Sequence, residues 1–125
     1  MIKQLKSSEI KNFLINNKNT ELLDVRTQDE WDNVGMPDGE KLGLKTHFIT
    51  IVRSQDPNAN EDFVLEVKNK VDSSKQLLVI CKAGSRSMMA AQLLSKESIE
   101  CINISDGFEG NGENVGWKNE GLPSK

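Results

Sequence analysis

The sequence contains no tyrosine, one histidine, two cysteines and three prolines in 125 residues. Two cysteines are too few for the disulfide framework of a small secreted domain. The sequence also lacks the apolar amino-terminal segment of a signal peptide and any apolar run of membrane-spanning length. Its net charge of −3 argues against a broad surface for binding phosphate backbones. We therefore expect a cytoplasmic protein that binds neither nucleic acid nor a membrane.

The length of the chain and the order of its apolar segments predict a single α/β domain over residues 1–125. Short β-branched segments alternate with segments of helix-forming residues, which is typical of a parallel sheet covered by helices on both faces. Strands are predicted at 22–25, 46–51, 77–80 and within 99–104, and helices from residue 7 or 8, from 28, over 61–71, over 87–96 and within 116–123. Polar residues predict a loop at 53–60 and a flexible insertion at 111–116.

The apolar run from Leu77 to Ile80 predicts a central parallel strand, because a strand that is apolar throughout suits burial on both faces. Cys81 follows directly, at the carboxyl end of this strand. Ligands of open α/β sheets bind beyond the carboxyl ends of the strands. A helix is expected to begin near Ser87 after a short loop, and it carries an apolar stripe formed by Met89, Ala90, Leu93 and Leu94.

The loop after Cys81 predicts an anion-binding cradle around a thiol. Such a loop aims backbone N–H groups inward, and the first helical turn adds unpaired donors and the positive end of its dipole. Lys82 and Arg86 add positive charge, and Gly84 allows the backbone a positive φ or a close approach to a ligand. This environment favours the thiolate and makes Cys81 a predicted nucleophile. The alternative for Cys81 is a small core residue, because cysteine is among the most buried residue types.

Polar residues near the predicted strand at 22–25 are further candidates for the site. Asp24 and Arg26 lie at the carboxyl end of that strand, the edge at which Cys81 is also expected. Thr27 and Glu30 have the spacing of a capping box, in which each satisfies a backbone donor of the other at the start of a helix. Both the acid–Arg pair and Glu30 could therefore support the site or simply hold the local structure.

Two further residues of chemical interest have structural interpretations. The lone His47 falls within a predicted strand, and no pattern pairs it with Cys81, so we expect a structural or surface residue. Cys101 also falls within a predicted strand. We expect Cys101 to be packed in the core rather than to act as a resolving thiol for Cys81.

Several motifs follow one another in a specific order over nearly the whole chain. They are Asp24-Val25-Arg26-Thr27, Glu30-Trp31, Cys81-Lys82-Ala83-Gly84-Ser85-Arg86-Ser87, Gly107-Phe108-Glu109-Gly110, Gly116-Trp117-Lys118 and Gly121-Leu122-Pro123. In this order and spacing the chain resembles the single-domain rhodaneses, which are thiosulfate sulfurtransferases. The resemblance implies a five-stranded, mostly parallel sheet with helices on both faces.

The resemblance also implies a reaction. Cys81 would accept sulfane sulfur from thiosulfate or a similar donor, hold it as a persulfide, and pass it to cyanide, a thiol or a protein cysteine. The substrate-binding loop implied by the resemblance consists of Lys82, Ala83, Gly84, Ser85 and Arg86, supported by Asp24, Arg26, Glu30 and Ser87. The implied chemistry uses no metal and no cofactor.

Other functions remain open at the level of the sequence. A cysteine phosphatase or arsenate reductase could use a similar cradle, but phosphatases of this type place Arg six residues after the nucleophile. Here Ser87 occupies that position and Arg86 precedes it. A non-catalytic module, or one that relays sulfur to a partner protein, is the other alternative. Substrate specificity is open as well, because the chain departs from the commoner family pattern at Met36, 53–60 and 111–116.

Overall fold

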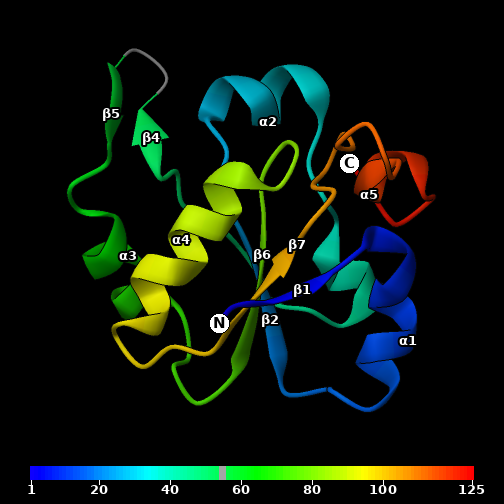
Figure 1. The fold of residues 1–125 in the computed structure, drawn as a ribbon, viewed down its shortest axis with the longest axis horizontal. Helices are drawn as coiled ribbons and strands as arrows, with labels where there is room; N and C mark the ends of the chain where they lie inside the picture. Colours follow the sequence, from blue (N-terminus) through cyan, green and yellow to red (C-terminus); the bar gives the residue numbers. More distant parts are fainter. Residues whose placement is uncertain (54–55) are drawn as a thin grey trace.

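The computed structural model describes residues 1–53 and 56–125 and contains a five-stranded sheet in which every neighbouring pair of strands is parallel (Figure 1). The strand order is β1-β7-β6-β2-β3. The strands are β1 (Lys3–Leu5), β2 (Thr20–Asp24), β3 (Thr46–Phe48), β6 (Gln76–Ile80) and β7 (Cys101–Ile104). The predicted α/β fold is confirmed, and the sheet is entirely rather than mostly parallel. The sequence patterns did not predict β1.

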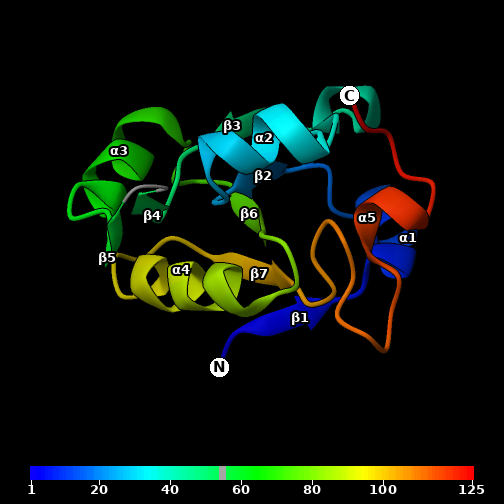
Figure 2. The same cartoon turned by 90° about the horizontal axis from the view of Figure 1, so that it is seen from above.

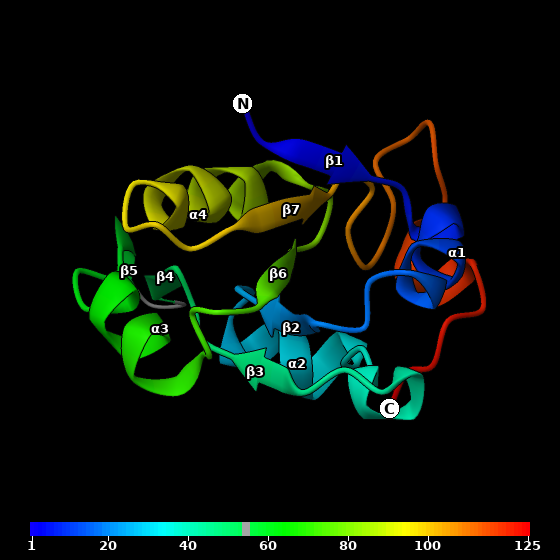
Figure 3. The same ribbon diagram turned by 90° about the horizontal axis from the view of Figure 1, so that it is seen from below.

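Helices cover both faces of this sheet, as predicted (Figures 2 and 3). The α-helices are α1 (Ile10–Ile15), α2 (Gln28–Val34), α3 (Phe63–Lys70), α4 (Ser85–Ser95) and α5 (Gly116–Asn119), and the 3₁₀ helices are η1 (Ser7–Glu9) and η2 (Gly39–Leu42). One core cluster joins the sheet to α3 and α4, and a second joins it to α1 and α5. None of the described helices is long and apolar enough to cross a bilayer.

The buried face of α4 differs from the predicted apolar stripe. Of the four residues in the predicted stripe, Ala90 and Leu94 are buried, whereas Met89 and Leu93 are 42% and 36% exposed. The buried positions are Ser87, Ala90, Ala91 and Leu94. Their spacing of three and four residues is that of one helix face, and the small side chains allow α4 to pack closely on the sheet.

The polar segment at 53–60 is not simply the predicted loop. Strands β4 (Val52–Arg53) and β5 (Asp56–Ala59) pair antiparallel in a two-stranded ribbon, with Val52 opposite Ala59. Residues 54 and 55, also within the predicted loop, lie outside the described part of the chain. A ribbon of this kind is held by backbone hydrogen bonds, so its side chains need not show the apolar pattern of a core strand.

Candidate active site

Cys81 lies at the carboxyl end of the most central strand. β6 pairs with β2 on one side and β7 on the other, and Asp24 pairs with Ile80 in the last register position before Cys81. The Cys81 side chain is 1% exposed and belongs to the core cluster formed with α3 and α4. Its sulfur accepts a hydrogen bond from the backbone N–H of Gly84 at 3.1 Å. The sulfur is thus both packed and held by the loop that follows it.

The loop that surrounds the sulfur is shaped by two glycines. Gly84 has φ +105°, and a Cβ at this position would lie 2.3 Å from the carbonyl oxygen of Ser105. Gly107, in the turn after β7, has φ +62°, and its Cβ would lie 2.3 Å from the carbonyl oxygen of Lys82. Only glycine tolerates these conformations and approaches. In the same turn, Phe108 N donates a hydrogen bond to the Cys81 carbonyl at 2.8 Å, so the turn holds the loop in place by direct contact.

Two polar side chains lie beneath the sulfur. The hydroxyl oxygen of Ser87 is 3.2 Å from Cys81 Sγ and 2.5 Å from Asn103 Oδ1. Asn103 Nδ2 donates to the Gly84 carbonyl and to Gln4 Oε1, both at 3.1 Å. Ser87 was among the predicted site residues, whereas Asn103 was missed. Its signal in the sequence is an amide between two isoleucines of a buried strand, a position where a polar group needs hydrogen-bond partners.

Arg86 and Glu30 join the start of α4 to the start of α2. Arg86 Nη1 donates to Glu30 Oε1 at 2.6 Å, and Nη2 donates to Oε2 at 2.9 Å, with both side chains largely buried. The pKa of Arg86 is raised, first by the hydrogen bond to Glu30, and attraction to Cys81 and Asp24 acts in the same direction against desolvation. The guanidinium therefore lies within electrostatic reach of the sulfur. Three other loop residues are exposed: Lys82, Ala83 and Ser85.

Glu30 has two roles in this arrangement. The predicted capping box is confirmed, because Thr27 Oγ1 accepts from Glu30 N at 3.3 Å while Glu30 Oε1 accepts from Thr27 N at 3.2 Å. The same carboxylate binds Arg86. Burial raises the pKa of Glu30, but the hydrogen bond and attraction from Arg86, with those from Thr27, outweigh burial and leave this pKa below its ordinary value.

The lowered pKa of Glu30 makes stability depend on pH. A carboxyl whose folded-state pKa is depressed contributes stability above its unfolded pKa, and this contribution is lost as the pH falls through the folded pKa. We expect Glu30→Gln to reduce the free energy of unfolding by about 1 kcal/mol at neutral pH. Urea unfolding should show this difference shrinking as the pH falls below the ordinary carboxyl value of 4.5. The exposed Glu113→Gln serves as the control, and a difference independent of pH would contradict the expected role.

Asp24 and Arg26 form a pair that is fully buried. Arg26 Nη2 donates to Asp24 Oδ2 at 2.8 Å and to the Gly35 carbonyl at 2.9 Å. The guanidinium also lies 4.4 Å from the centre of the Phe108 ring. Phe108 belongs to the core cluster on the face of the sheet opposite Cys81. The pair therefore contacts the turn after β7 through Phe108, on the face of the sheet opposite the sulfur.

The remaining histidine and cysteine have structural surroundings. His47 Nε2 is 2.8 Å from Glu21 Oε1, and both side chains are buried, in agreement with the structural prediction. Cys101 is opposite Leu77 in the sheet, four residues before Cys81, which corresponds to about 13 Å along a strand. Burial, with a smaller contribution from Glu100, raises the pKa of Cys101 to about 12. Cys101 is thus a packed thiol that lies too far away to resolve Cys81.

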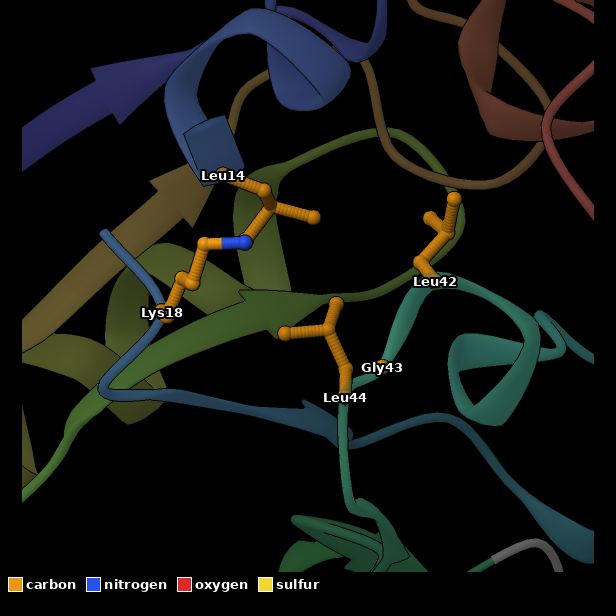
Figure 4. A pocket seen from close by; sticks show the side chains of 5 residues that line it. All are labelled: Leu14, Lys18, Leu42, Gly43 and Leu44. Carbon is orange, nitrogen blue, oxygen red and sulfur yellow. The ribbon is translucent and has the colours of Figure 1, made fainter. Parts of the chain in front are cut away.

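A hollow with a volume of about 160 Å³ lies at another part of the surface (Figure 4). It is lined by Leu14, Lys18, Leu42, Gly43 and Leu44, from α1 and the segment after it and from the end of η2 and the segment that follows. Thr46 pairs with Leu22, so this lining precedes β3 and lies toward the amino ends of the strands. Cys81 is at the opposite, carboxyl edge of the sheet, which separates the hollow from the cradle.

Comparison with known proteins gives a consistent assignment. The model of the rhodanese-like domain family matches residues 7–113. An uncharacterized protein from Rickettsia prowazekii is 36% identical in an alignment that covers 98% of this chain and 97% of that protein. A crystal structure from M. tuberculosis superposes with a TM-score of 0.86 at 28% identity, covering 98% of this chain and 96% of the other. A rhodanese-like domain protein from Staphylococcus aureus, covering 99% of both chains, gives a TM-score of 0.68 at 22% identity.

One structural neighbour carries a different description. A protein of unknown function from Rhodopseudomonas palustris, described as a possible tyrosine phosphatase, has a TM-score of 0.58 at 18% identity and covers 99% of this chain and 85% of its own. Likeness at this level of identity shows a shared fold. The choice between sulfur and phosphate chemistry must therefore rest on the residues around Cys81.

Proposed function

The chain belongs to the rhodanese-like domain family, and we propose that it is a sulfurtransferase that carries sulfane sulfur on Cys81. The donor is thiosulfate or a similar small molecule, and the acceptor is a thiol, cyanide or a protein cysteine. The observation that carries the proposal is the cradle: the sulfur of Cys81 ends the central strand, accepts the Gly84 N–H and lies within electrostatic reach of Arg86. We place this reaction in the cytoplasm, where thiols are kept reduced.

The proposed reaction has two covalent steps. The Cys81 thiolate attacks the outer sulfur of thiosulfate, the sulfur–sulfur bond of the donor breaks, and sulfite leaves with the bonding electron pair. Cys81 then carries a persulfide whose outer sulfur holds the negative charge. The acceptor nucleophile attacks this outer sulfur, and the bond to Sγ breaks. The thiolate of Cys81 is regenerated, so the cycle needs no other oxidant or reductant.

The geometry supports the binding of an anion at this place. The loop from Lys82 to Gly84 precedes the first turn of α4, whose backbone N–H groups and dipole favour negative charge. Arg86 adds a guanidinium that can face the oxyanion of the donor, and Glu30 holds this guanidinium in place. Since Cys81 is 1% exposed, a small donor that inserts only its terminal sulfur suits the site best.

The position of Ser87 argues for sulfur transfer over phosphate hydrolysis. Phosphatases of the related type need an arginine at the sixth position after the nucleophile to bind the phosphate. In this chain the sixth residue is Ser87, which is buried and has its hydroxyl 3.2 Å from Cys81 Sγ. The cradle is therefore shorter by one residue and fits a single sulfur atom better than a phosphate group.

The persulfide itself gives the direct test. The purified and reduced protein is incubated with thiosulfate, and its intact mass is recorded before and after addition of cyanide. We expect a gain of one sulfur atom per chain that maps to Cys81 and is removed as thiocyanate. An unchanged mass, or a gain on Cys101, would overturn the proposal. Hydrolysis of a small aryl phosphate without any sulfur gain would instead support the phosphatase alternative.

A further inference from the structure

The hydrogen bonds beneath Cys81 form a chain that leads away from the sulfur. Ser87 Oγ lies between Cys81 Sγ at 3.2 Å and Asn103 Oδ1 at 2.5 Å. Asn103 Nδ2 continues the chain to the Gly84 carbonyl and to Gln4 Oε1 on β1. The three inner side chains, Cys81, Ser87 and Asn103, are each at most 1% exposed, so water does not compete for these contacts.

The direction of this chain follows from counting protons. A serine hydroxyl has one hydrogen to donate, and the carbonyl oxygen of an asparagine has none. At 2.5 Å the contact between Ser87 Oγ and Asn103 Oδ1 requires a hydrogen between the two oxygens, and only Ser87 can supply it. Ser87 is then left with lone pairs toward Cys81. It accepts a hydrogen bond from the thiol and gives none to the thiolate.

The orientation of the Asn103 amide is fixed by its other contacts. Nδ2 donates to the carbonyl of Gly84, the residue whose N–H binds the sulfur. Rotating the amide by half a turn would place Oδ1 against that carbonyl, and two acceptors would face each other. Gly84 therefore holds Asn103 with its oxygen toward Ser87, and the loop and the strand determine the hydrogen bonding of the sulfur together.

We propose that Asn103 is a positioning residue that keeps the Ser87 proton away from Cys81, and that it thereby limits thiolate formation while leaving the thiolate more reactive. Ionisation of the thiol releases its proton to solvent. Ser87 can donate a hydrogen bond to the thiolate only if it breaks its hydrogen bond to Asn103 Oδ1, which would leave that buried oxygen without this donor. A thiolate with fewer hydrogen bonds is the stronger nucleophile. The persulfide carries its charge on the outer sulfur, so the bond between Ser87 and Asn103 persists in the loaded state.

The charged groups around Cys81 come from each element packed against it, and they stay unchanged when Asn103 is replaced. Arg86 attracts the thiolate, and Glu30 pairs with Arg86. On neighbouring elements, ion pairs join Asp24 to Arg26, His47 and Lys75 to Glu21, and Lys68 to Glu97. Lys82, in the loop after Cys81, is exposed. Because these charges are the same in every variant at Asn103, differences in the ionisation of Cys81 between the variants report the change in the Ser87 hydrogen bond.

The test is the pH dependence of Cys81 alkylation by iodoacetamide, followed by mass. In Asn103→Ala, Ser87 is free to donate to the thiolate. We expect the midpoint of the profile to move about one pH unit to the acid side and the rate at high pH to fall about threefold, as nucleophilicity falls with basicity. A loosened or merely destabilised loop would not combine an acid shift of the midpoint with a slower rate at high pH. An unchanged or alkaline-shifted midpoint would overturn the proposal.

Ser87→Ala keeps the test decisive if Asn103→Ala does not fold. If Ser87 donated to the thiolate in the wild type, its removal would raise the midpoint, whereas the proposal expects no rise. In the Ser87→Ala background, Asn103→Ala should have no further effect, since it acts through Ser87. Asn17→Ala removes another amide-to-carbonyl bond, at the end of α1, and serves as the matched control with an unchanged profile.

The consequence for sulfur loading rests on the proposed function, whereas alkylation does not. Asn103→Ala should lower the rate of persulfide formation with thiosulfate at high pH by the same factor of about three. If the alkylation profile shifts but no chain gains sulfur, the role of Asn103 stands and the sulfurtransferase proposal fails. If sulfur loading occurs and the profile does not shift, the sulfurtransferase proposal stands and the role of Asn103 fails.

Discussion

Replacement of Cys81 by serine is expected to reduce thiosulfate-dependent formation of thiocyanate by at least about a thousandfold, to the level of the uncatalysed reaction. A serine hydroxyl is not ionised at neutral pH and forms no persulfide. The substitution should leave the fold intact, because Oγ can still accept the hydrogen bond from Gly84 N that Sγ now accepts. We expect the free energy of unfolding to change by no more than about 1 kcal/mol. Turnover and urea unfolding are measured on the same preparations.

Cys101→Ser is the matched control for this experiment. It removes the other thiol of the chain, which is buried as the first residue of β7 and has a pKa raised to about 12. Turnover should stay within a factor of about two of the wild type, while burial of the new hydroxyl costs about 1–3 kcal/mol of stability. Turnover by Cys81→Ser within tenfold of the wild type would remove Cys81 from the reaction, and loss of turnover in a folded Cys101→Ser would give Cys101 a part in it.

The cradle could be predicted because its determinants are local in sequence. The apolar run Leu77–Ile80 has the length and composition of a buried strand, Cys81 follows at once, and Gly84 permits the tight turn into the next helix. Three adjacent signals thus describe strand, nucleophile and turn. The start of α4 at Ser85, earlier than the predicted Ser87, follows from the positive φ of Gly84, which ends the loop and caps the helix directly.

The contacts that orient the cradle could not be predicted, because they join residues far apart in the chain. Arg86 and Glu30 are 56 positions apart, and only the fold brings the starts of α4 and α2 together. The spacing of Thr27 and Glu30 predicted the capping box, but it gave no sign of the ion pair between Glu30 and Arg86. Asn103 lies 16 residues after its partner Ser87, and a single polar residue within a strand does not indicate which side chain it will meet.

Strand β1 shows why short edge strands are missed. It has three residues, of which only Leu5 is buried, so its side chains carry almost no periodic signal. Its pairing with β7 depends on backbone groups that β7 leaves open at the edge of the sheet. Yet β1 reaches the site, because Gln4 accepts a hydrogen bond from Asn103.

Gly84→Ala is expected to have the largest effect on the structure of the site. Its φ of +105° strains any side chain, and the added Cβ would lie 2.3 Å from the backbone oxygen of Ser105, which cannot move without displacing the turn after β7. We expect a loss of about 3 kcal/mol or more in the free energy of unfolding. We also expect at least a hundredfold slower sulfur loading, because the shifted loop withdraws the Gly84 N–H from Cys81 Sγ.

Gly43→Ala separates backbone strain from the clash. Gly43 also has a positive φ, +80°, but a Cβ there meets no atom within 4 Å, and the residue follows η2 at the other edge of the sheet. This variant should lose only about 1–2 kcal/mol and should load sulfur at the wild-type rate. The difference between the two variants then measures the contact of Gly84 with the turn. Equal losses of stability, with sulfur loading preserved in both, would mean that this contact does not set the geometry around Cys81. The loop would then have to be held by the hydrogen bond from Phe108 N to the Cys81 carbonyl.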